Sequence, residues 1–363
     1  MLKSRGLRWN LMLFLPILIC VWLMSVNAQE RMNNTALELQ KILKIEEPNT
    51  RIDALKDFAE RHPKLNSKLP AYSAIFDTYR ELNDSQPTET FAREILAKET
   101  QLKIRQLAYG NLLSIFQETD GNKLEVLARS IIQTESAPIL LSSAYDGLVA
   151  YYSEYAVDSL ETLANEMLRI RLINGMTCNN LAWSLIESDL NPELGLQLAL
   201  FGDEQLTAAN FTKLYPDLSE DQVQEYLRQY RGYIKDTIGW GYYKIGQNDL
   251  AEKYLEEALT LYNAPDAEVS LHLGTVLAVL GQNDRAIKVL TAALMVNQSE
   301  EGLALLAELL GKTTAETEAY LQKQQLAVAQ PAEDFTLNDL NGQSHTLSNY
   351  HGNVVIVNFF SPT

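Results

Sequence analysis

Ile245-Gly246-Gln247-Asn248-Asp249-Leu250-Ala251 recurs 35 residues further along the chain as Leu280-Gly281-Gln282-Asn283-Asp284-Arg285-Ala286. The flanking residues keep the same spacing and pair as Gly239 with Gly274, Leu255 with Leu290, and Ala258 with Ala293. A period of this length is typical of a helix, a short glycine-containing turn and a second helix that repeat along the chain. Small residues are then expected where paired helices approach closely, with large apolar residues filling the spaces between them.

A fainter repeat occupies the upstream half of the chain. An Ala-Tyr pair opens three segments, at Ala71-Tyr72, Ala108-Tyr109 and Ala144-Tyr145. Seven residues after each of these tyrosines stands another aromatic residue: Tyr79, Phe116 and Tyr152. Seven residues make about two helical turns, so each aromatic pair is predicted to lie on one buried helix face. The second helices are marked by alanines at a period of 36: Ala92, Ala128 and Ala164.

These repeats predict a mainly α-helical chain of about seven helix pairs with one insertion. A single pair cannot bury its own apolar face, so neighbouring pairs must stack to form a continuous core. We expect the following segments: residues 35–202, degenerate helical repeats; 203–235, an insertion; 236–300, two clear repeat units; and 301–326, a closing helical pair.

The segment Asp236-Thr237-Ile238-Gly239-Trp240-Gly241-Tyr242-Tyr243-Lys244-Ile245-Gly246 resembles the first helix of a tetratricopeptide repeat. The resemblance implies an α-solenoid whose concave surface binds protein or peptide segments. Matching the inward-facing positions of that family predicts five partner contacts: Asn179, Trp183, Trp240, Tyr243 and Lys244. The alternative for the two tryptophans is packing between helices. Other members of that family hold an acidic C-terminus with a clamp of basic and asparagine residues, and Asp236 occupies one of these places. An acidic C-terminal ligand is therefore disfavoured.

The helical period stops after Ala329-Gln330-Pro331. Phe335, Leu337 and the Asn341-Gly342 turn predict a short strand and a hairpin bend. Val354 to Phe360 is an apolar, β-branched run that suits a central strand buried on both faces. Such a strand needs a larger sheet than these last residues supply, so we expect residues 331–363 to be the first part of an incomplete α/β domain.

This C-terminal segment resembles the start of the thioredoxin-like redoxins, in particular the TlpA-like thiol-disulfide oxidoreductases and their alkyl hydroperoxide reductase/thiol-specific antioxidant relatives. The matching residues are Pro331, Asp334, Phe335, Leu337, Asp339, Gly342, Leu347, Ser348, Gly352, Val354, Val355, Asn358 and Phe359, with Phe360 in place of a tryptophan. In that family a C-x-x-C pair directly follows the strand, at the start of a helix that lowers the pKa of the first thiol. The resemblance implies that the chain is truncated before this pair, and no catalytic residue can be carried over.

Three functions remain open on these grounds. The first is a repeat scaffold joined to a redoxin domain that, in the intact protein, exchanges disulfides with a thiol protein. The second is a non-enzymatic binding protein with a vestigial redoxin segment. The third is a peroxiredoxin-type peroxidase, because peroxiredoxins share the same opening strands.

Composition excludes several other kinds of site. The chain has 47 acidic and 30 basic residues and a net charge of −17, which disfavours nucleic-acid binding. The only cysteines are Cys20 and Cys178, too few for a disulfide framework or a zinc site, and Cys178 is expected to be a buried packing residue. No two of the four histidines, His62, His272, His345 and His351, have metal-ligand spacing, so each is assigned a surface or packing role. We expect no cofactor and no metal site.

The N-terminus has the layout of a secretory signal peptide. Basic residues precede the apolar run Leu11 to Met24, and Val26-Asn27-Ala28 places small residues where a signal peptidase cuts. We therefore expect residues 1–28 to be removed near Ala28 and the remainder to be exported to the periplasm or another extracytoplasmic space. The alternative is an uncleaved N-terminal membrane anchor, which leaves the rest of the chain outside the cytoplasm as well.

Overall fold

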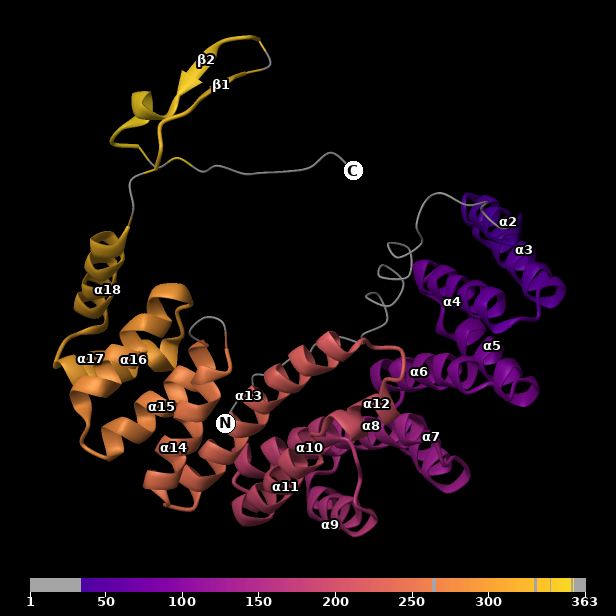
Figure 1. Cartoon of the computed structure of the whole chain (residues 1–363), viewed down its shortest axis with the longest axis horizontal. Helices are drawn as coiled ribbons and strands as arrows, with labels where there is room; N and C mark the ends of the chain where they lie inside the picture. The colour runs from indigo at the N-terminus through magenta and orange to yellow at the C-terminus, as the bar shows by residue number, and fades with distance from the viewer. Residues whose placement is uncertain (1–33, 263–265, 330–331, 340, 354, 356–363) are drawn as a thin grey trace. The chain divides into compact units, whose positions relative to one another are not determined.

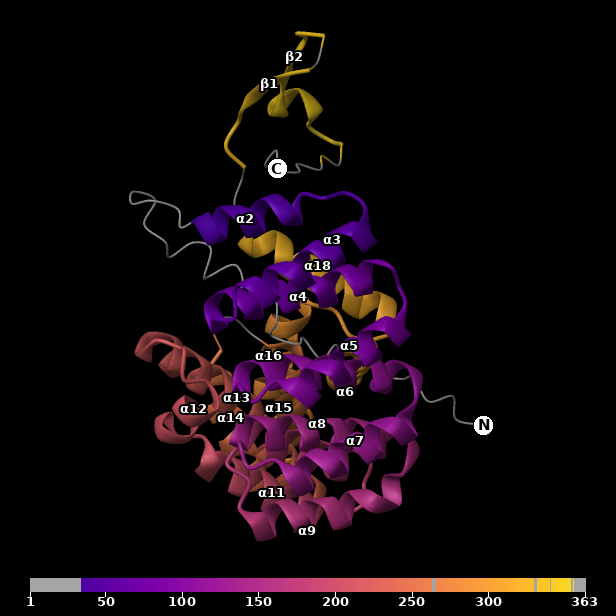
Figure 2. The ribbon, with the colours of Figure 1, turned by 90° about the vertical axis from the view of Figure 1, so that its right-hand side faces the viewer.

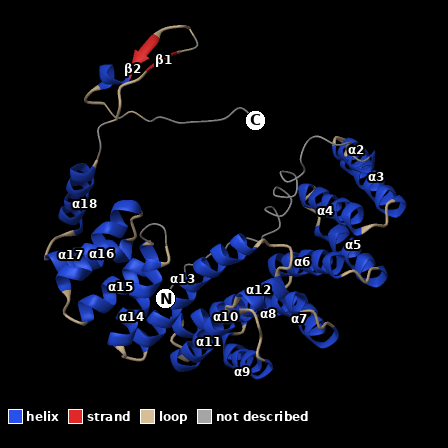
Figure 3. Cartoon of the chain, viewed as in Figure 1, coloured by secondary structure: helices blue, strands red, loops and turns tan. Residues whose placement is uncertain are grey.

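The computed structural model describes residues 34–262, 266–329, 332–339, 341–353 and 355. In these residues seventeen α-helices pack in neighbouring pairs, and one two-stranded sheet follows them (Figures 1 and 3). The mainly α-helical repeat fold predicted from the sequence is therefore confirmed. The predicted signal peptide lies outside the described residues. No described helix combines the length and the apolar composition needed to cross a membrane.

The chain divides into two compact units, residues 1–157 and 158–363. The helices of the first unit are α2 (Asn34–Leu43), α3 (Pro48–Arg61), α4 (Leu65–Glu81), α5 (Ser85–Lys98), α6 (Leu102–Thr119), α7 (Gly121–Thr134) and α8 (Pro138–Tyr155). They follow one another in successive layers (Figure 2). The short 3-10 helix η1 (Val157–Ser159) joins the two units.

The aromatic pairs of the upstream repeat lie in α4, α6 and α8. Five of the six rings are buried, and Tyr72 is half-buried. The alanines that open the three segments are fully buried in the same helices: Ala71, Ala108 and Ala144. The period of about 36 residues therefore places equivalent side chains in the core of successive helix pairs.

The second unit contains α9 (Leu160–Ile170), α10 (Gly175–Glu187), α11 (Pro192–Gln205), α12 (Ala208–Leu214), α13 (Glu220–Lys244), α14 (Asn248–Thr260), α15 (Ala267–Val279), α16 (Asn283–Val296), α17 (Glu300–Leu310) and α18 (Thr314–Val328). The 35-residue repeat is the pair α13 and α14 followed by the pair α15 and α16. The glycines that end the first helix of each pair, Gly246 and Gly281, have φ angles of 77° and 73°. Only glycine adopts this left-handed conformation readily, which explains why both repeats carry it.

One long helix crosses a boundary expected from the sequence. The sequence predicts an insertion at residues 203–235 and a new repeat unit from 236, but α13 continues from Glu220 to Lys244 without a break. A capping box between Ser219 and Gln222 starts this helix. The helix continues through Gly232, where the ring of Tyr262 packs within about 3.0 Å of the place where a Cβ would stand.

The C-terminal segment forms the predicted hairpin. Strand β1 (Thr336–Asn338) pairs antiparallel with β2 (Ser344–Thr346), with Leu337 opposite His345. Gly342 has a φ of 81° in the bend between them. The short helix η2 (Leu347–Tyr350) follows. The buried strand predicted for Val354 to Phe360 lies outside the described residues except for Val355, which is exposed and belongs to no strand.

Candidate functional site

The five predicted contact residues come from two helices of the second unit. Asn179 and Trp183 lie in α10, and Trp240, Tyr243 and Lys244 lie in α13. Helix α13 contacts both α10 and α15. We call the surface formed by these three helices, each the first helix of a pair, the first-helix face.

His272, for which the sequence predicts a surface or packing role, lies at the centre of this face. The ring of His272, in α15, stacks on Trp240 with 4.3 Å between centroids and lies 5.6 Å from the ring of Trp183. Its Nδ1 is 2.8 Å from Oδ1 of Asp236 in α13. His272 is 7% exposed and Asp236 8% exposed. We call Trp183, Asp236, Trp240, Tyr243 and His272 the His272 cluster.

Electrostatics favour the charged form of this histidine. Burial alone would lower the pKa of His272, but the carboxylate of Asp236, with Glu268 and Glu187 nearby, outweighs it and raises the pKa above its ordinary value of 6.5. The pKa of the Glu268 carboxyl is also raised, although the residue is exposed at the surface. Desolvation by its surroundings is the largest cause, and the charges of Asp236, Asp266 and Glu187 add to it, whereas His272 lowers this pKa. The His272 ring therefore faces three carboxylates, those of Asp236, Glu268 and Glu187, which favour its protonated form.

Trp240 is held on several sides. Its Nε1 donates a hydrogen bond to Oε2 of Glu187 at 3.1 Å, which connects α13 to α10. Tyr243 stacks on the indole with 4.7 Å between centroids, and Nζ of Lys244 lies 5.6 Å from the ring. Lys244 is itself bound to both carboxylate oxygens of Asp189 at 3.0 and 3.1 Å. These contacts fix the indole orientation, while the Trp183, Trp240 and Tyr243 side chains each remain partly exposed.

Asn179 differs from the other four predicted residues because it is only 6% exposed. Its Oδ1 has no hydrogen-bond partner in the described part of the chain. Asn179 stands three residues before Ala182, as Asp236 stands three residues before Gly239, so the two occupy equivalent places in α10 and α13. Asn179 therefore belongs to a helix of the first-helix face, but its side chain is buried beneath that surface.

The spacing of Asp236 and His272 in the sequence could have indicated that they form a pair, although their residue types do not. The two residues are 36 positions apart, one repeat period plus one residue. First helices of successive pairs lie side by side, so residues separated by about one period can meet across them. Glu187 was missed as well, since its partner Trp240 lies 53 residues away.

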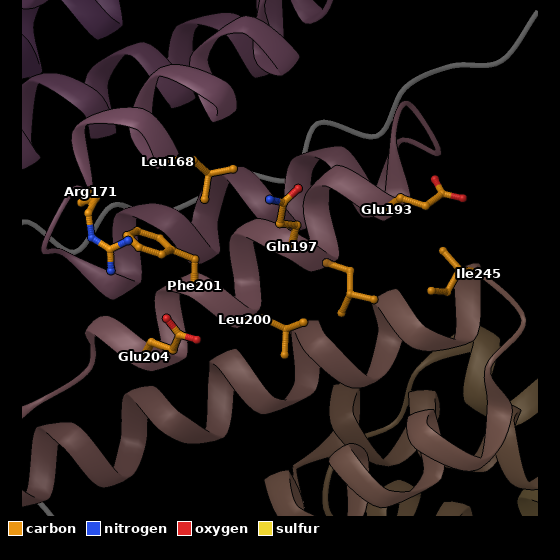
Figure 4. Close-up of a pocket in the computed structure, with 9 residues that line it drawn as sticks. Leu168, Arg171, Glu193, Gln197, Leu200, Phe201, Glu204 and Ile245 are labelled. Carbon is orange, nitrogen blue, oxygen red and sulfur yellow. The ribbon is translucent and has the colours of Figure 1, made fainter.

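An open groove lies on another part of the second unit. It has a volume of about 560 Å³ and is lined mainly by α9 and α11: Leu168, Arg171, Glu193, Leu196, Gln197, Leu200, Phe201 and Glu204, with Ile245. Figure 4 shows Arg171 and Phe201 at one end and Glu193 and Ile245 at the other. The guanidinium of Arg171 lies 5.4 Å from the Phe201 ring centroid. None of the five predicted contact residues lines this groove.

The described residues include one cysteine, Cys178. They contain no group of three or more histidine, cysteine or acidic side chains that could hold a metal ion. Cys178 is fully buried in α10, where its Cβ lies 3.2 Å from the place of a Cβ on Gly202. Comparison with models of protein families and with curated protein sequences found no match to the chain.

Proposed function

We propose that the helical part of this chain is a scaffold of the tetratricopeptide-repeat type that binds protein or peptide segments on its first-helix face. The observation that carries the proposal is the His272 cluster, which gathers partly exposed aromatic side chains from α10 and α13 over a buried ion pair. The equivalent glycines and leucines of the two clear repeats support the tetratricopeptide assignment.

The chemistry of this face suits a peptide ligand. Tryptophan and tyrosine supply large contact areas with few rotatable bonds, and such residues dominate binding energy at protein interfaces. The bonds from Trp240 to Glu187 and from Lys244 to Asp189 hold the side chains in place before a ligand arrives, which lowers the entropic cost of binding. The exposed carboxylates of Glu187, Asp189 and Glu268 favour a neutral or basic segment over an acidic one.

A displayed-peptide selection against the full chain tests this proposal. We expect the selected peptides to lose about 30-fold or more in affinity with Trp183→Ala or Trp240→Ala, because truncating a central aromatic anchor costs about 2 kcal/mol or more. Tyr155→Ala is the matched control, since Tyr155 is a 63% exposed aromatic residue at the end of α8 in the other unit. Circular dichroism must show that each variant is folded. Peptides that bind all three variants as tightly as the original chain would contradict the proposal.

We also propose that the C-terminal segment begins a thioredoxin-like domain and that the protein is exported. The hairpin supports the first part, because its turn and strands fall on the residues that resemble the redoxins. Asp334 connects the start of the segment to the residues after β2, because its Oδ1 accepts a hydrogen bond from the Ser348 amide at 2.8 Å. In the intact protein the scaffold would then present a bound thiol or disulfide protein to the redox domain.

The coding sequence after Thr363 separates the three readings of this segment. A C-x-x-C within the next few codons supports disulfide exchange, and the protein carrying it should reduce a model disulfide. A Thr-x-x-Cys supports the peroxidase, and a stop codon supports a protein that only binds.

A further inference from the structure

We propose that the first-helix face is a proton-sensitive binding surface in which protonated His272 holds α10, α13 and α15 together and loss of that proton weakens binding of a partner segment. This inference rests on the proposed function and adds a regulatory element to it.

The geometry makes His272 the meeting point of the three helices. It belongs to α15, bonds to Asp236 of α13 at 2.8 Å and stacks on Trp240 of the same helix. On the other side its ring lies 5.6 Å from Trp183 of α10, and Trp240 is bonded to Glu187 of α10. A change in the charge of this one ring therefore alters the surroundings of both partly exposed tryptophans.

The charged groups around the ring are mostly acidic. Asp236 faces it from α13, Glu187 from α10, and Glu268 lies one turn before it in α15. Tyr262 and Asp266, between α14 and α15, interact with Asp236 and with Glu268 respectively. Lys244 of α13, which lies over the Trp240 ring, is bound to Asp189. The imidazolium is thus the counter-charge for three carboxylates.

The direction of the pH effect follows from this arrangement. The pKa of His272 in the folded chain lies above 6.5, so the stabilisation that it contributes is complete below that pH and is lost as pH rises through the raised pKa. Deprotonation leaves the buried carboxylate of Asp236 beside a neutral ring and removes the positive charge that Glu187 and Glu268 face. It also removes the imidazolium from the face of Trp240, where Lys244 remains as the other cation.

A titration of the full chain without any partner tests the first half of the proposal. The sequence has four tryptophans, and replacing Trp9 and Trp22 by phenylalanine leaves only the two of the face, so their fluorescence reports on it. We expect their emission to change with pH at the same midpoint as the His272 ring resonances in a proton NMR titration, above pH 6.5. A His272 midpoint at or below 6.5, or emission that does not follow it, would overturn the proposal.

Variants assign the transition to this pair. His272→Gln should abolish the fluorescence transition, and Asp236→Asn should move it to lower pH because the raising charge is removed. His62→Gln is the matched control, since His62 also pairs with a carboxylate, Glu38 at 3.1 Å, but belongs to the first unit. If His272→Gln fails to fold, the titration of the chain that retains His272 still shows whether the fluorescence transition follows the protonation of this ring.

The second half concerns binding. A peptide selected on the full chain at pH 6 should bind at least about fivefold more weakly once pH exceeds the measured midpoint, a change at the low end of coupling between two sites. His272→Gln should remove this pH dependence. Equal affinity on both sides of the midpoint would refute the regulatory role while leaving the peptide-binding function intact. If no peptide binds at either pH, the proposed function itself fails, whereas the titration still reports on His272.

Discussion

At the scale of residues, a contact between a glycine and a leucine closes each of the two clear helix pairs. A Cβ built on Gly239 would lie 2.6 Å from Cγ of Leu255, and one on Gly274 would lie 2.7 Å from Cγ of Leu290. These are the glycines and leucines that the 35-residue repeat aligns, so both repeats close their two helices through the same contact. The missing side chain allows α13 to approach α14, and α15 to approach α16, with the leucine filling the space.

Adding one methyl group at either glycine tests this packing. Gly239→Ala or Gly274→Ala should lower the free energy of unfolding by about 1–3 kcal/mol, because a close-packed leucine must move. Gly110→Ala in α6 is the control: its added Cβ meets no atom within 4 Å, so it should stabilise the chain by about 0.5–1 kcal/mol. Urea unfolding followed by circular dichroism measures both. Equal effects at Gly110 and Gly239 would refute the packing argument.

At the scale of elements, ionic hydrogen bonds tie helix ends together in the first unit. Lys68 and Tyr72 of α4 both donate to Glu99, which caps the C-terminus of α5. The phenol remains a donor because burial and then the charge of Glu99 raise the pKa of Tyr72 to about 12. The same arrangement recurs in the next helix pair of the first unit. There the three residues at the matching places are Arg105, Tyr109 and Glu135.

Arg105 extends the link to a third helix. It also donates to the carbonyl oxygens of Leu96 and Glu99, at 3.0 and 3.1 Å, and so satisfies groups that the end of α5 leaves without a partner. One side chain of α6 therefore joins the end of α5 to the end of α7. Since each such group contacts only neighbouring helices, it sets the stacking of one pair on the next.

Removing one hydroxyl from this group tests its contribution. Tyr109→Phe deletes the bonds to Glu135 at 2.8 Å and from Arg105 at 3.0 Å and should cost about 1–2 kcal/mol of unfolding free energy. Tyr155→Phe, at an exposed position, is expected to have almost no effect. The two variants are compared by urea unfolding at pH 7. A Tyr109→Phe chain as stable as the original would show that these bonds contribute nothing net.

At the scale of the whole molecule, the chain consists of two units that each contain their own core. The division falls between Val157 and Asp158, within residues 35–202, for which the sequence predicts a single run of degenerate helical repeats. In a repeat protein each pair is stabilised by its neighbours, so a junction between compact units is a place where the chain opens first.

Limited proteolysis tests this division. Chymotrypsin at low concentration should cut first after Tyr155, whose side chain is 63% exposed beside the junction, and yield two resistant fragments. Replacing Tyr155 by threonine should abolish this cut, and mass spectrometry identifies the fragment ends. First cuts within α13 or α15 instead would contradict the placement of the junction.

Local patterns in the sequence determined the helix pairs, the glycine turns and the C-terminal hairpin. Each depends on residues close in the chain: small and large side chains at helical spacing, a left-handed glycine at Gly246 and Gly281, and Asn341-Gly342 between two short strands. The five predicted contact residues lie in two of these helices, α10 and α13, and their binding role stays a prediction.

Only the tertiary structure decided how the first-helix face is built. Asp236 and His272 become a buried pair because α13 and α15 pack side by side, and Trp240 donates a hydrogen bond to Glu187, the last residue of α10. The burial and charge of a histidine depend on such distant neighbours, which residue type and local spacing do not specify. The continuity of α13 and the junction at Val157 likewise depend on packing between helices. The repeat itself, in contrast, could be recognised from the order of the residues.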